Sequence, residues 1–555
     1  MPIFDEAHRA IHYPPDRRFR VWINPWFSIA FAVVVLGPIP VAWAQYLVAG
    51  LPTQTFLPPI NLGNPPTPYG FPAWLRLTHF VNFFFLMLLV RSGLSILMDH
   101  PRLYWNRHCT PNSEWMRLTP LEAPTHGEWT AKEDARYISP WLALPGYRHT
   151  VGMARSWHFL SVYGFLLNGF IFVAFLFFTD QWKRLVPTSW EIVPASWKVF
   201  VYYATFHLPA EPNGFYQFNP LQQLSYFAVI FIMAPLSMLT GIAMSPAIDN
   251  RFPFFPKLFG SRQGARSIHF LLLISYLCFL AVHVGLVAVT GFVKNMNHIV
   301  TGRDDAGLIG MILGLVAIGL VVLSWAFFHL IAWKCPRAMQ HAYKAIAGLF
   351  HSNVLSRLKP AERYTDADIS PFFWPNGKMP TSHKWKQLAA NGFKDFRLKV
   401  GGLVEHPIEL SLEDLRALGK EAYISMHHCI QGWSGIAQWG GLSLKRLIEI
   451  VKPKPQAKVI AFYSYGDALY GGEYYDTQSI ETALKARCLL AYEMNRAPLP
   501  KAYGAPLRLR VENQLGYKMV KWIERIEFVE TETTLGKGEG GKSEDDEYFD
   551  ILPNI

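Results

Sequence analysis

Six apolar segments, each long enough to cross a lipid bilayer, constrain this chain more than any other feature. They occupy residues 25–48, 74–98, 156–179, 222–245, 267–291 and 308–333. A helix needs about twenty mostly apolar residues to span the hydrocarbon core, and its backbone groups must be satisfied within the segment. Residues 1–333 are therefore predicted to form an all-α bundle of six transmembrane helices in contact with membrane lipid.

The chemistry of the chain changes after Trp333. No further span follows, and short runs such as Phe396–Val400 and Leu507–Val511 carry apolar residues at every second position. This alternation is typical of half-buried strands. Ser411, with Asp414 three residues later, indicates the start of a short helix.

These patterns divide the second half of the chain into three parts. We expect a basic connector, then a compact mixed α+β domain, then a flexible acidic tail rich in glycine. The three parts are residues 334–370, 371–530 and 531–555.

The net charge of +11 would suggest nucleic acid as the partner of a soluble protein. Here Lys and Arg gather in the N-terminal arm, in residues 99–155 and 246–266 and after Trp333, whereas residues 49–73 contain none. Positively charged loops mark the cytoplasmic face of a membrane protein. We therefore expect no nucleic acid partner and a multi-pass protein of the inner membrane. Both termini are expected in the cytoplasm, since no cleavable or twin-arginine export signal is evident.

Four histidines lie within the apolar segments or at their ends, where an ionisable side chain is costly and usually functional. They are His79, His158, His269 and His283. Three of them follow an arginine by one helical turn, in Arg76-Leu-Thr-His79, Arg155-Ser-Trp-His158 and Arg266-Ser-Ile-His269. This spacing places the arginine at the water interface and the histidine deeper on the same face. A b-type haem requires two imidazoles for its iron and cations for its propionates.

The alternating topology pairs these histidines by depth. Segments three and five run in the same direction, so His158 and His269 both lie near the cytoplasmic side. His283 comes 14 residues after His269, about 21 Å along the helix and close to a whole number of turns. This brings His283 to the depth of His79. We predict two stacked haems, an inner one between His158 and His269 and an outer one between His79 and His283.

The alternative interpretation is that these histidines make polar contacts between helices. His329, which has no partner at its depth, is expected to be structural. The chain has no CxxCH motif, so any haem is expected to be held without a covalent link to cysteine.

The membrane half resembles the bacterial di-haem cytochrome b family, which includes the membrane subunits of respiratory formate dehydrogenases, nickel hydrogenases and thiosulfate reductases. The matching residues are Arg76-Leu-Thr-His79, Asn219-Pro-Leu-Gln-Gln-Leu-Ser-Tyr226, and Arg266-Ser-Ile-His269 with His283. The resemblance covers segments two to five, and segments one and six look like additions to this core.

The most distinctive stretch of the C-terminal half is His427-His428-Cys429-Ile-Gln-Gly-Trp433. A cysteine beside two histidines admits three interpretations: a metal ligand, a catalytic thiol or a buried core residue. Farther along, Arg508 follows Gly-Ala-Pro-Leu, and Lys518 and Lys521 follow Gly516. Cations beside glycines suit an anionic cofactor that bears phosphate, although ordinary basic strand ends give the same pattern.

Together these motifs closely resemble the sulfite-oxidase-type molybdopterin domain, particularly its methionine-sulfoxide-reductase-like branch, over residues 371–530. The resemblance implies that Cys429 is the single protein thiolate on molybdenum, for which a soft ligand is suited. It implies that Arg508 and Lys521 help to hold the molybdopterin, with Lys518 as a further candidate. Asn376, in Phe373-Trp-Pro-Asn376-Gly, is the candidate from an upstream loop.

A di-haem membrane module joined to a molybdenum domain implies electron transfer between the quinone pool and a small substrate at molybdenum. Flow from quinol would reduce an S-oxide or an N-oxide, and the reductase-like branch favours this direction. Sulfite-type oxidation, with electrons passed to quinone, is one alternative. The other is a metal-free docking domain on an electron-transfer subunit that serves a separate soluble or membrane redox partner.

Overall fold

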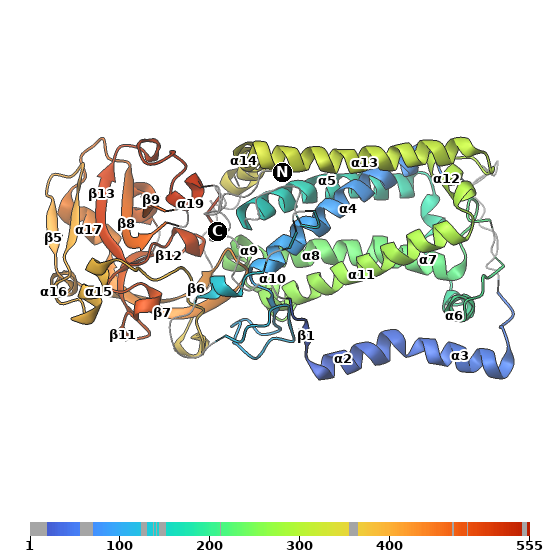
Figure 1. Ribbon diagram of the computed structural model, residues 1–555, viewed down its shortest axis with the longest axis horizontal. Coiled ribbons are helices and arrows are strands. Elements are labelled where there is room, and N and C mark those ends of the chain that lie inside the picture. Colours follow the sequence, from blue (N-terminus) through green and yellow to red (C-terminus); the bar gives the residue numbers. More distant parts are fainter. Residues whose placement is uncertain are drawn as a thin grey trace.

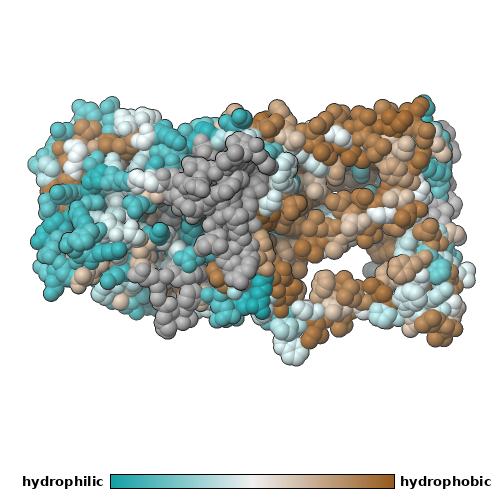
Figure 2. Space-filling view, in the orientation of Figure 1, coloured by the Kyte–Doolittle hydropathy of each residue, from teal (hydrophilic) through white to brown (hydrophobic). Residues whose placement is uncertain are grey.

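The computed structural model separates the apolar helices and the C-terminal domain into the two ends of an elongated molecule (Figure 1). Hydrophobic side chains cover the helical end, whereas hydrophilic side chains cover much of the end that contains the sheets (Figure 2). One end is therefore suited to lipid and the other to water. The structure describes residues 19–55, 70–123, 130–136, 138–139, 141–143, 151–210, 213–353, 364–468, 471–485, 487–546 and 552–555.

Six helical stretches in this described part of the chain are long and apolar enough to cross a membrane, which confirms the predicted bundle. They are α2 with α3 (Pro25–Phe31 and Pro38–Ala49), α4 (Ala73–Asp99), α5 (Val151–Phe178), α7 with α8 (Pro220–Phe227 and Ala234–Met244), α11 (Arg262–Val289) and α13 (Leu308–Lys334). The chain is a multi-pass membrane protein.

Two of these spans contain a π-helical turn just before a proline. The turn Ala32–Leu36 precedes Pro38 in the first span, and the turn Ala228–Met233 precedes Pro235 in the fourth. A proline inside a helix has no amide hydrogen and clashes with the carbonyl four residues earlier, so the backbone widens there. In the fourth span the widened turn begins just after Tyr226.

Polar side chains join neighbouring helices of the bundle. Asn168 of α5 donates from its side-chain amide to the carbonyl of Thr78 at 2.9 Å and to Oδ1 of Asn82 at 2.7 Å, both on α4. The first span runs along one side of the bundle (Figure 1). It is held near its end by Trp197 of α6 (Ile192–Ala204), whose indole donates to Gln45 at 2.9 Å.

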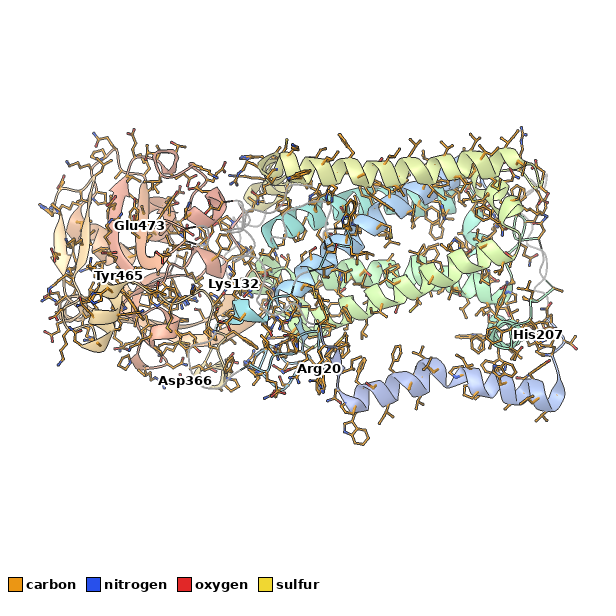
Figure 3. All side chains as sticks on the ribbon, in the orientation of Figure 1. Arg20, Lys132, His207, Asp366, Tyr465 and Glu473 are labelled. Atoms are coloured by element: carbon orange, nitrogen blue, oxygen red, sulfur yellow. The ribbon has the colours of Figure 1, made fainter. Side chains whose placement is uncertain are left out.

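Short elements close both ends of the bundle. α6 and α12 (Phe292–Val300) lie at the end away from the sheets, where His207 follows α6 (Figures 1 and 3). α9 (Pro246–Arg251) and α10 (Phe254–Lys257) lie at the end near the sheets. A small antiparallel sheet has the order β1 (Trp22–Ile23), β3 (Met116–Arg117) and β2 (Arg102–Leu103).

The C-terminal domain is the predicted mixed α+β fold, and its described residues form two five-stranded sheets. The first contains β11 (Ala497–Pro498), β10 (Cys488–Met494), β7 (Ser434–Ser443) and β6 (Glu421–His428) in that order, with β12 (Arg508–Val511) also paired to β10. The second has the order β5 (Ile408–Leu410), β4 (Leu398–Gly402), β13 (Ile523–Val529), β8 (Val459–Asp467) and β9 (Glu473–Ser479). β4 and β13 are parallel, and the other pairs are antiparallel.

Short helices flank these sheets. They are α15 (His383–Ala390), α16 (Leu412–Ala417), α17 (Leu444–Val451) and α18 (Ile480–Lys485). The predicted helix start at Ser411 is present, because the Ser411 hydroxyl accepts from the backbone of Asp414 while the Asp414 carboxylate accepts from the backbone of Ser411. This reciprocal capping satisfies two backbone donors at the end of α16.

The expected boundary at residue 333 does not separate the two halves completely, because the loop between α4 and α5 adds to the core of the C-terminal domain. Tyr104, Cys109 and Ala131 from this loop are buried in the same apolar cluster as Trp374. The Trp374 indole donates to the carbonyl of Cys109 at 2.6 Å. Packing against the domain removes the apolar side chains of these loop residues from water.

The connector contains a helix, and the tail differs from the expectation of a flexible segment in the residues that the structure describes. The connector contains α14 (Pro336–Asn353), from which Tyr343 stacks on Phe159 of α5 at 5.6 Å between ring centroids. The tail, expected to be flexible, packs on the C-terminal domain in its described parts. In its α19 (Lys542–Asp545), Ser543, Glu544 and Asp545 are buried. The composition of the tail is typical of a disordered segment, but Glu544 is paired with the buried ammonium group of Lys518.

Candidate functional site

The four membrane histidines form the two pairs that the topology predicted. His79 of α4 faces His283 of α11 with ring centroids 6.3 Å apart, and His158 of α5 faces His269 of α11 at 6.5 Å. When two imidazoles bind one metal ion from opposite sides, each metal–nitrogen bond is about 2 Å long and each nitrogen lies about 1 Å from the centre of its ring. The two ring centres are then about 6 Å apart. Each pair therefore has a spacing that would allow both of its imidazoles to bind one metal ion.

Hydroxyl groups set the orientation of the inner pair. Ser92 Oγ lies 3.1 Å from Nδ1 of His158, and Thr240 Oγ1 lies 3.0 Å from Nδ1 of His269. Each hydroxyl donates its own hydrogen to the carbonyl four residues earlier, at 2.7 Å in both cases. Because that hydrogen is committed, each hydroxyl accepts from Nδ1–H. The Nε2 lone pair of each ring is then available to a metal, as in other histidine ligands oriented by a second hydrogen bond.

Glycines lie beside the same two rings. A Cβ atom at Gly93 would lie 3.5 Å from Cε1 of His158, and one at Gly241 would lie 3.8 Å from Cε1 of His269. These helix positions leave room beside the imidazoles that a larger side chain would occupy. The spacing of the pairs, the free Nε2 atoms and this space fit a haem b at the inner pair.

In the outer pair, a tyrosine hydroxyl instead of a serine or threonine hydroxyl lies beside Nδ1 of His283. Tyr226 OH lies 3.4 Å from Nδ1 of His283, and Phe279 stacks on the His283 ring at 5.6 Å. Tyr226 belongs to the segment of the fourth span that the sequence analysis singled out.

The arginines one turn before the histidines have varied partners. Arg76 donates to the carbonyl of Val300 at 2.5 Å, and Arg155 lies over the Phe159 ring at 5.4 Å. Arg266, expected at a haem propionate, donates instead to the carbonyls of His100 and Arg102 at 2.7 and 2.9 Å. These carbonyls lie where α4 ends and the loop toward the C-terminal domain begins.

Cys429 lies in a tight turn directly after β6. Its backbone amide donates to the carbonyl of Trp433 at 3.1 Å, and the amide of Gly432, at φ +108°, donates to the carbonyl of Cys429 at 3.0 Å. The side-chain amide of Asn376 donates to Cys429 Sγ at 3.3 Å. Burial raises the pKa of the thiol to about 12, so a bound metal ion would be needed to keep it as a thiolate.

Three cations lie near His427 at the end of β6, directly before this turn: the buried Arg508 and Arg510 and the partly buried Lys521. Arg508 donates to the carbonyl of Tyr503 at 2.9 Å, and Lys521 donates to the carbonyls of Ala502 and Asn376. In the part of the chain that the structure describes, no carboxylate lies within 4.0 Å of these three cations. The Nε atoms of Arg508 and Arg510 are buried without a hydrogen-bond partner.

Burial lowers the pKa of all three cations. It lowers those of Arg508 and Lys521 well below their ordinary values, assisted by a neighbouring arginine in each case, and that of Arg510 to about 10. Buried cations without carboxylates are costly unless an anion accompanies them. The cluster therefore fits the phosphate of a molybdopterin, with Cys429 beside it as the thiolate ligand.

The structure separates one predicted residue from this cluster and adds another. Lys518, expected near the cofactor, forms ion pairs with Asp476 and with Glu544 of α19, the second at 2.8 Å. Arg510 was not among the predicted site residues, although it alternates with Arg508 on β12. Strand residues two apart share a face. The alternation of Arg508 and Arg510 on β12 is therefore the sequence signal that places Arg510 beside Arg508. The Arg510 guanidinium lies 2.8 Å from Nδ1 of His427.

The Cys429 turn is bonded directly to the membrane helices. Arg262 and Gln263, in the first turn of α11, donate to the carbonyl of Gly432 at 3.2 and 3.0 Å. Gln431 donates to the carbonyl of Asp99, the last residue of α4, at 3.2 Å. Lys132, from the loop between α4 and α5, lies at the same junction (Figure 3). The helix that carries His269 and His283 therefore begins against the turn that carries Cys429.

Comparison with known protein families identifies both halves of the chain. The family model of the prokaryotic cytochrome b561 matches residues 70–302, and that of the oxidoreductase molybdopterin binding domain matches residues 384–535. The protein thus joins a cytochrome b561-type membrane domain to a molybdopterin-binding oxidoreductase domain of the sulfite-oxidase type.

Curated relatives match parts of this arrangement. The protein-methionine-sulfoxide reductase catalytic subunit MsrP of Campylobacter jejuni is 30% identical over 173 residues, which are 29% of this chain and 58% of that protein. The subunit of the same name from Xanthomonas axonopodis pv. citri is 29% identical over 205 residues, 35% of this chain and 62% of that protein. The putative protein-methionine-sulfoxide reductase subunit YedZ1 of Azospira oryzae is 33% identical over 131 residues, 24% of this chain and 48% of that protein.

The chain thus spans between 48% and 62% of the length of these relatives. Among solved structures, the sulfane dehydrogenase SoxCD from Paracoccus pantotrophus is 24% identical, with 25% of this chain and 39% of that chain covered and a TM-score of 0.23.

Proposed function

We propose that this protein is a membrane-bound molybdoenzyme that uses electrons from quinol, carried by two b haems, to reduce an S-oxide at a molybdenum site. One observation carries the proposal: the turn with Cys429 is hydrogen-bonded to the first turn of α11, the helix that carries one histidine of each pair. The two candidate redox sites therefore share one structural element.

The C-terminal residues have separate tasks in this proposal. Cys429 supplies the thiolate, and Asn376 orients it through the hydrogen bond to Sγ. Arg508, Arg510 and Lys521 neutralise the phosphate of the molybdopterin by charge-assisted hydrogen bonds. When bound, the molybdenum cofactor supplies oxygen-atom transfer together with two-electron chemistry.

The membrane residues hold the haems. His158 and His269 ligate the inner haem through Nε2, and His79 and His283 ligate the outer one. Arg76 and Arg155, near the water interface, are the proposed cations for propionates. Arg266 instead fixes the start of α11 against the loop that leads to the C-terminal domain.

The names of the relatives favour a sulfoxide substrate over sulfite. Two of those relatives are methionine-sulfoxide reductase catalytic subunits. An S-oxide gains two electrons and two protons and yields the sulfide and water. We place the C-terminal domain and both termini in the cytoplasm, because the loops at that end of the bundle carry the basic residues.

Cofactor analysis of the purified full-length protein tests this proposal. We expect about one molybdenum and two b haems per chain, measured by elemental analysis and by the pyridine haemochromogen spectrum. Reduced viologen dye should be oxidised when methionine sulfoxide is added. Protein without molybdenum would instead indicate a docking domain, and electron transfer from sulfite to dye would indicate the oxidative direction.

A further inference from the structure

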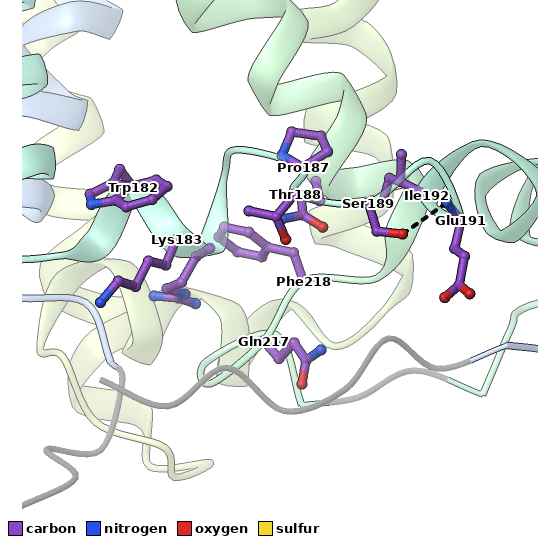
Figure 4. Close-up of a pocket in the computed structure, with 11 residues that line it drawn as sticks. Trp182, Lys183, Pro187, Thr188, Ser189, Glu191, Ile192, Gln217 and Phe218 are labelled. Carbon is purple, nitrogen blue, oxygen red and sulfur yellow. Dashed lines mark hydrogen bonds between the residues drawn. The ribbon is translucent and has the colours of Figure 1, made fainter. Parts of the chain in front are cut away.

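A cavity of about 340 Å³ lies at the end of the bundle away from the sheets, between the segment that joins α5 to α6, the start of α6 and the start of α7 (Figure 4). Trp182, Pro187, Ile192 and Phe218 form the apolar part of its wall. The remaining lining residues are polar or charged: Lys183, Arg184, Thr188, Ser189, Glu191, Gln217 and Gln223. Ligand sites commonly have this size and this combination of an apolar lining with a few polar groups.

From this cavity we infer a binding site for the ring of a lipid quinol; the inference rests on the proposed function and adds the place at which electrons enter. The cavity is large enough for a quinol ring but too small for a long isoprenoid tail, which must leave through its mouth. The ring hydroxyls need acceptors, and the wall offers the Glu191 carboxylate and the amide oxygens of Gln217 and Gln223, together with the hydroxyls of Thr188 and Ser189.

Aromatic contacts connect the cavity to the outer histidine pair. Phe218 lines the cavity, and its ring meets that of Tyr226 edge-on at 5.0 Å. The Tyr226 ring lies 6.0 Å from that of His283, and its hydroxyl lies 3.4 Å from Nδ1 of the same histidine. A quinol in the cavity is therefore two side-chain contacts away from His283.

The surroundings of the cavity suit a ligand that arrives from the membrane. Trp190 and Val193, next to the lining residues Ser189 and Ile192, are 89% and 52% exposed, and Phe178 at the end of α5 is 87% exposed. An exposed tryptophan at the end of a span is typical of the boundary between lipid and water, and exposed apolar side chains beside it suit contact with lipid. The mouth of the cavity thus lies where a quinol ring can enter while its tail remains in lipid.

The chemistry balances at this position. A quinol that becomes a quinone loses the hydrogens of its two hydroxyl groups as two protons and gives up two electrons. The protons pass to the polar wall and to water at this end of the bundle. The electrons leave one at a time past Phe218 and Tyr226 toward the His79–His283 pair, and they are consumed by the sulfoxide at the other end of the molecule.

The test is to fill the cavity with a larger side chain. We expect Thr188→Trp to reduce the rate of haem reduction by duroquinol at least tenfold and to abolish photo-crosslinking of an azido-quinone to the segments 182–192 and 217–223. Thr179→Trp is the matched control: Thr179 lies at the same end of the bundle but does not line the cavity, and its variant should behave as the unmodified protein does.

Dithionite-reduced haem spectra and dye-linked sulfoxide reduction separate this inference from the proposed function. Both should be normal in Thr188→Trp, which also shows that the variant is folded. Unchanged duroquinol oxidation and unchanged crosslinking in Thr188→Trp would overturn the site and leave the proposed function intact. Absence of haem or of dye-linked activity in the unmodified protein would overturn the proposed function itself.

Discussion

At the scale of single residues, the proposed chemistry of both halves depends on a few buried polar atoms and on the hydrogen bonds that they make. The thiol of Cys429 is buried with an amide donor beside it, and three cations near it have no carboxylate partner among the described residues. In the bundle, the hydroxyls of Ser92 and Thr240 dictate which nitrogen of a histidine carries hydrogen. Each arrangement depends on one or two side chains and can be tested by a single substitution.

Cys429→Ser should abolish turnover without unfolding the protein. A hydroxyl of nearly the same volume replaces a soft thiolate, so stability should change by about 1 kcal/mol or less, whereas molybdenum loses its protein ligand. Dye-linked sulfoxide reduction should fall to background while the haem spectra stay unchanged. Cys488→Ser, in the core strand β10, is the matched control. If that variant lost activity and Cys429→Ser kept it, the assigned site would be wrong.

Ser92→Ala should change the inner haem alone. Without the hydroxyl, Nδ1 of His158 loses its hydrogen-bond acceptor, and loss of such a partner typically weakens metal binding by about 10–100-fold. A redox titration followed by visible spectra should show one shifted or depleted haem and one that is unaffected. Ser324→Ala removes a hydroxyl that likewise donates to the carbonyl four residues back, and it should leave both haems unchanged. Equal effects of the two variants would contradict the role of Ser92.

At the scale of elements, α11 and α19 do most to organise the molecule. α11 contributes a histidine to each pair and begins against the Cys429 turn. α19, in a segment whose composition resembles a disordered tail, brings Glu544 to the buried ammonium group of Lys518. One element therefore connects the two candidate redox sites, and the other pairs with a buried lysine of the C-terminal domain.

His269→Ala and His283→Ala should remove different haems, because the two side chains belong to different pairs on one helix. The pyridine haemochromogen assay should give about one haem per chain for each variant, with different midpoint potentials for the haem that remains. His329→Ala provides the control on α13, where Trp141 stacks on the ring at 5.3 Å, and it should retain both haems. Loss of the same haem in both α11 variants would refute the pairing.

Lys518→Met and Lys521→Met should have different effects, although the two lysines belong to the same segment, the first buried and the second partly buried. Lys518 neutralises Asp476 and Glu544, and removal of one member of a buried ion pair costs about 3–5 kcal/mol. Chemical unfolding should therefore show a large loss of stability for Lys518→Met. Lys521→Met should instead lose molybdopterin with little destabilisation. Equal molybdopterin loss in two equally stable variants would restore Lys518 to the cofactor site.

At the scale of the whole molecule, the two halves are arranged as one proposed path for electron transfer. The proposed quinol cavity lies at one end of the bundle and Cys429 at the other, with the two histidine pairs between them. The loop between α4 and α5 contributes Tyr104 and Cys109 to the core of the C-terminal domain. We therefore expect electron transfer within a single chain, without a soluble carrier between the bundle and the molybdenum site.

Membrane orientation is also a property of the whole molecule. Alkaline phosphatase, which is active only after export, should be inactive when fused after Ile555 and active when inserted after Trp190, which lies beside the cavity. The basic loops at the Ile555 end of the bundle determine this outcome by the positive-inside rule. The reverse pattern of activity would move the C-terminal domain to the outside and exchange the inner and outer haem positions.

The sequence by itself determined the features that depend on local pattern. Length and apolar composition identified six spans, and residue periodicity identified β4, β12 and the capped start of α16. The depths of the histidines predicted their pairing, because a helix converts sequence separation into distance along the membrane normal. The motif around Cys429 was likewise visible, since its resemblance depends on neighbouring residues.

Only the tertiary structure decided which distant groups meet. Nothing local to Lys518 distinguishes it from Lys521, yet one lies against Asp476 and Glu544 and the other against the carbonyls of Ala502 and Asn376. The same is true of Arg266, whose partners are carbonyls more than 160 residues away in the sequence. Such contacts form because buried polar groups must find partners wherever the fold brings them. That requirement acts in three dimensions, and no local pattern in the sequence records it.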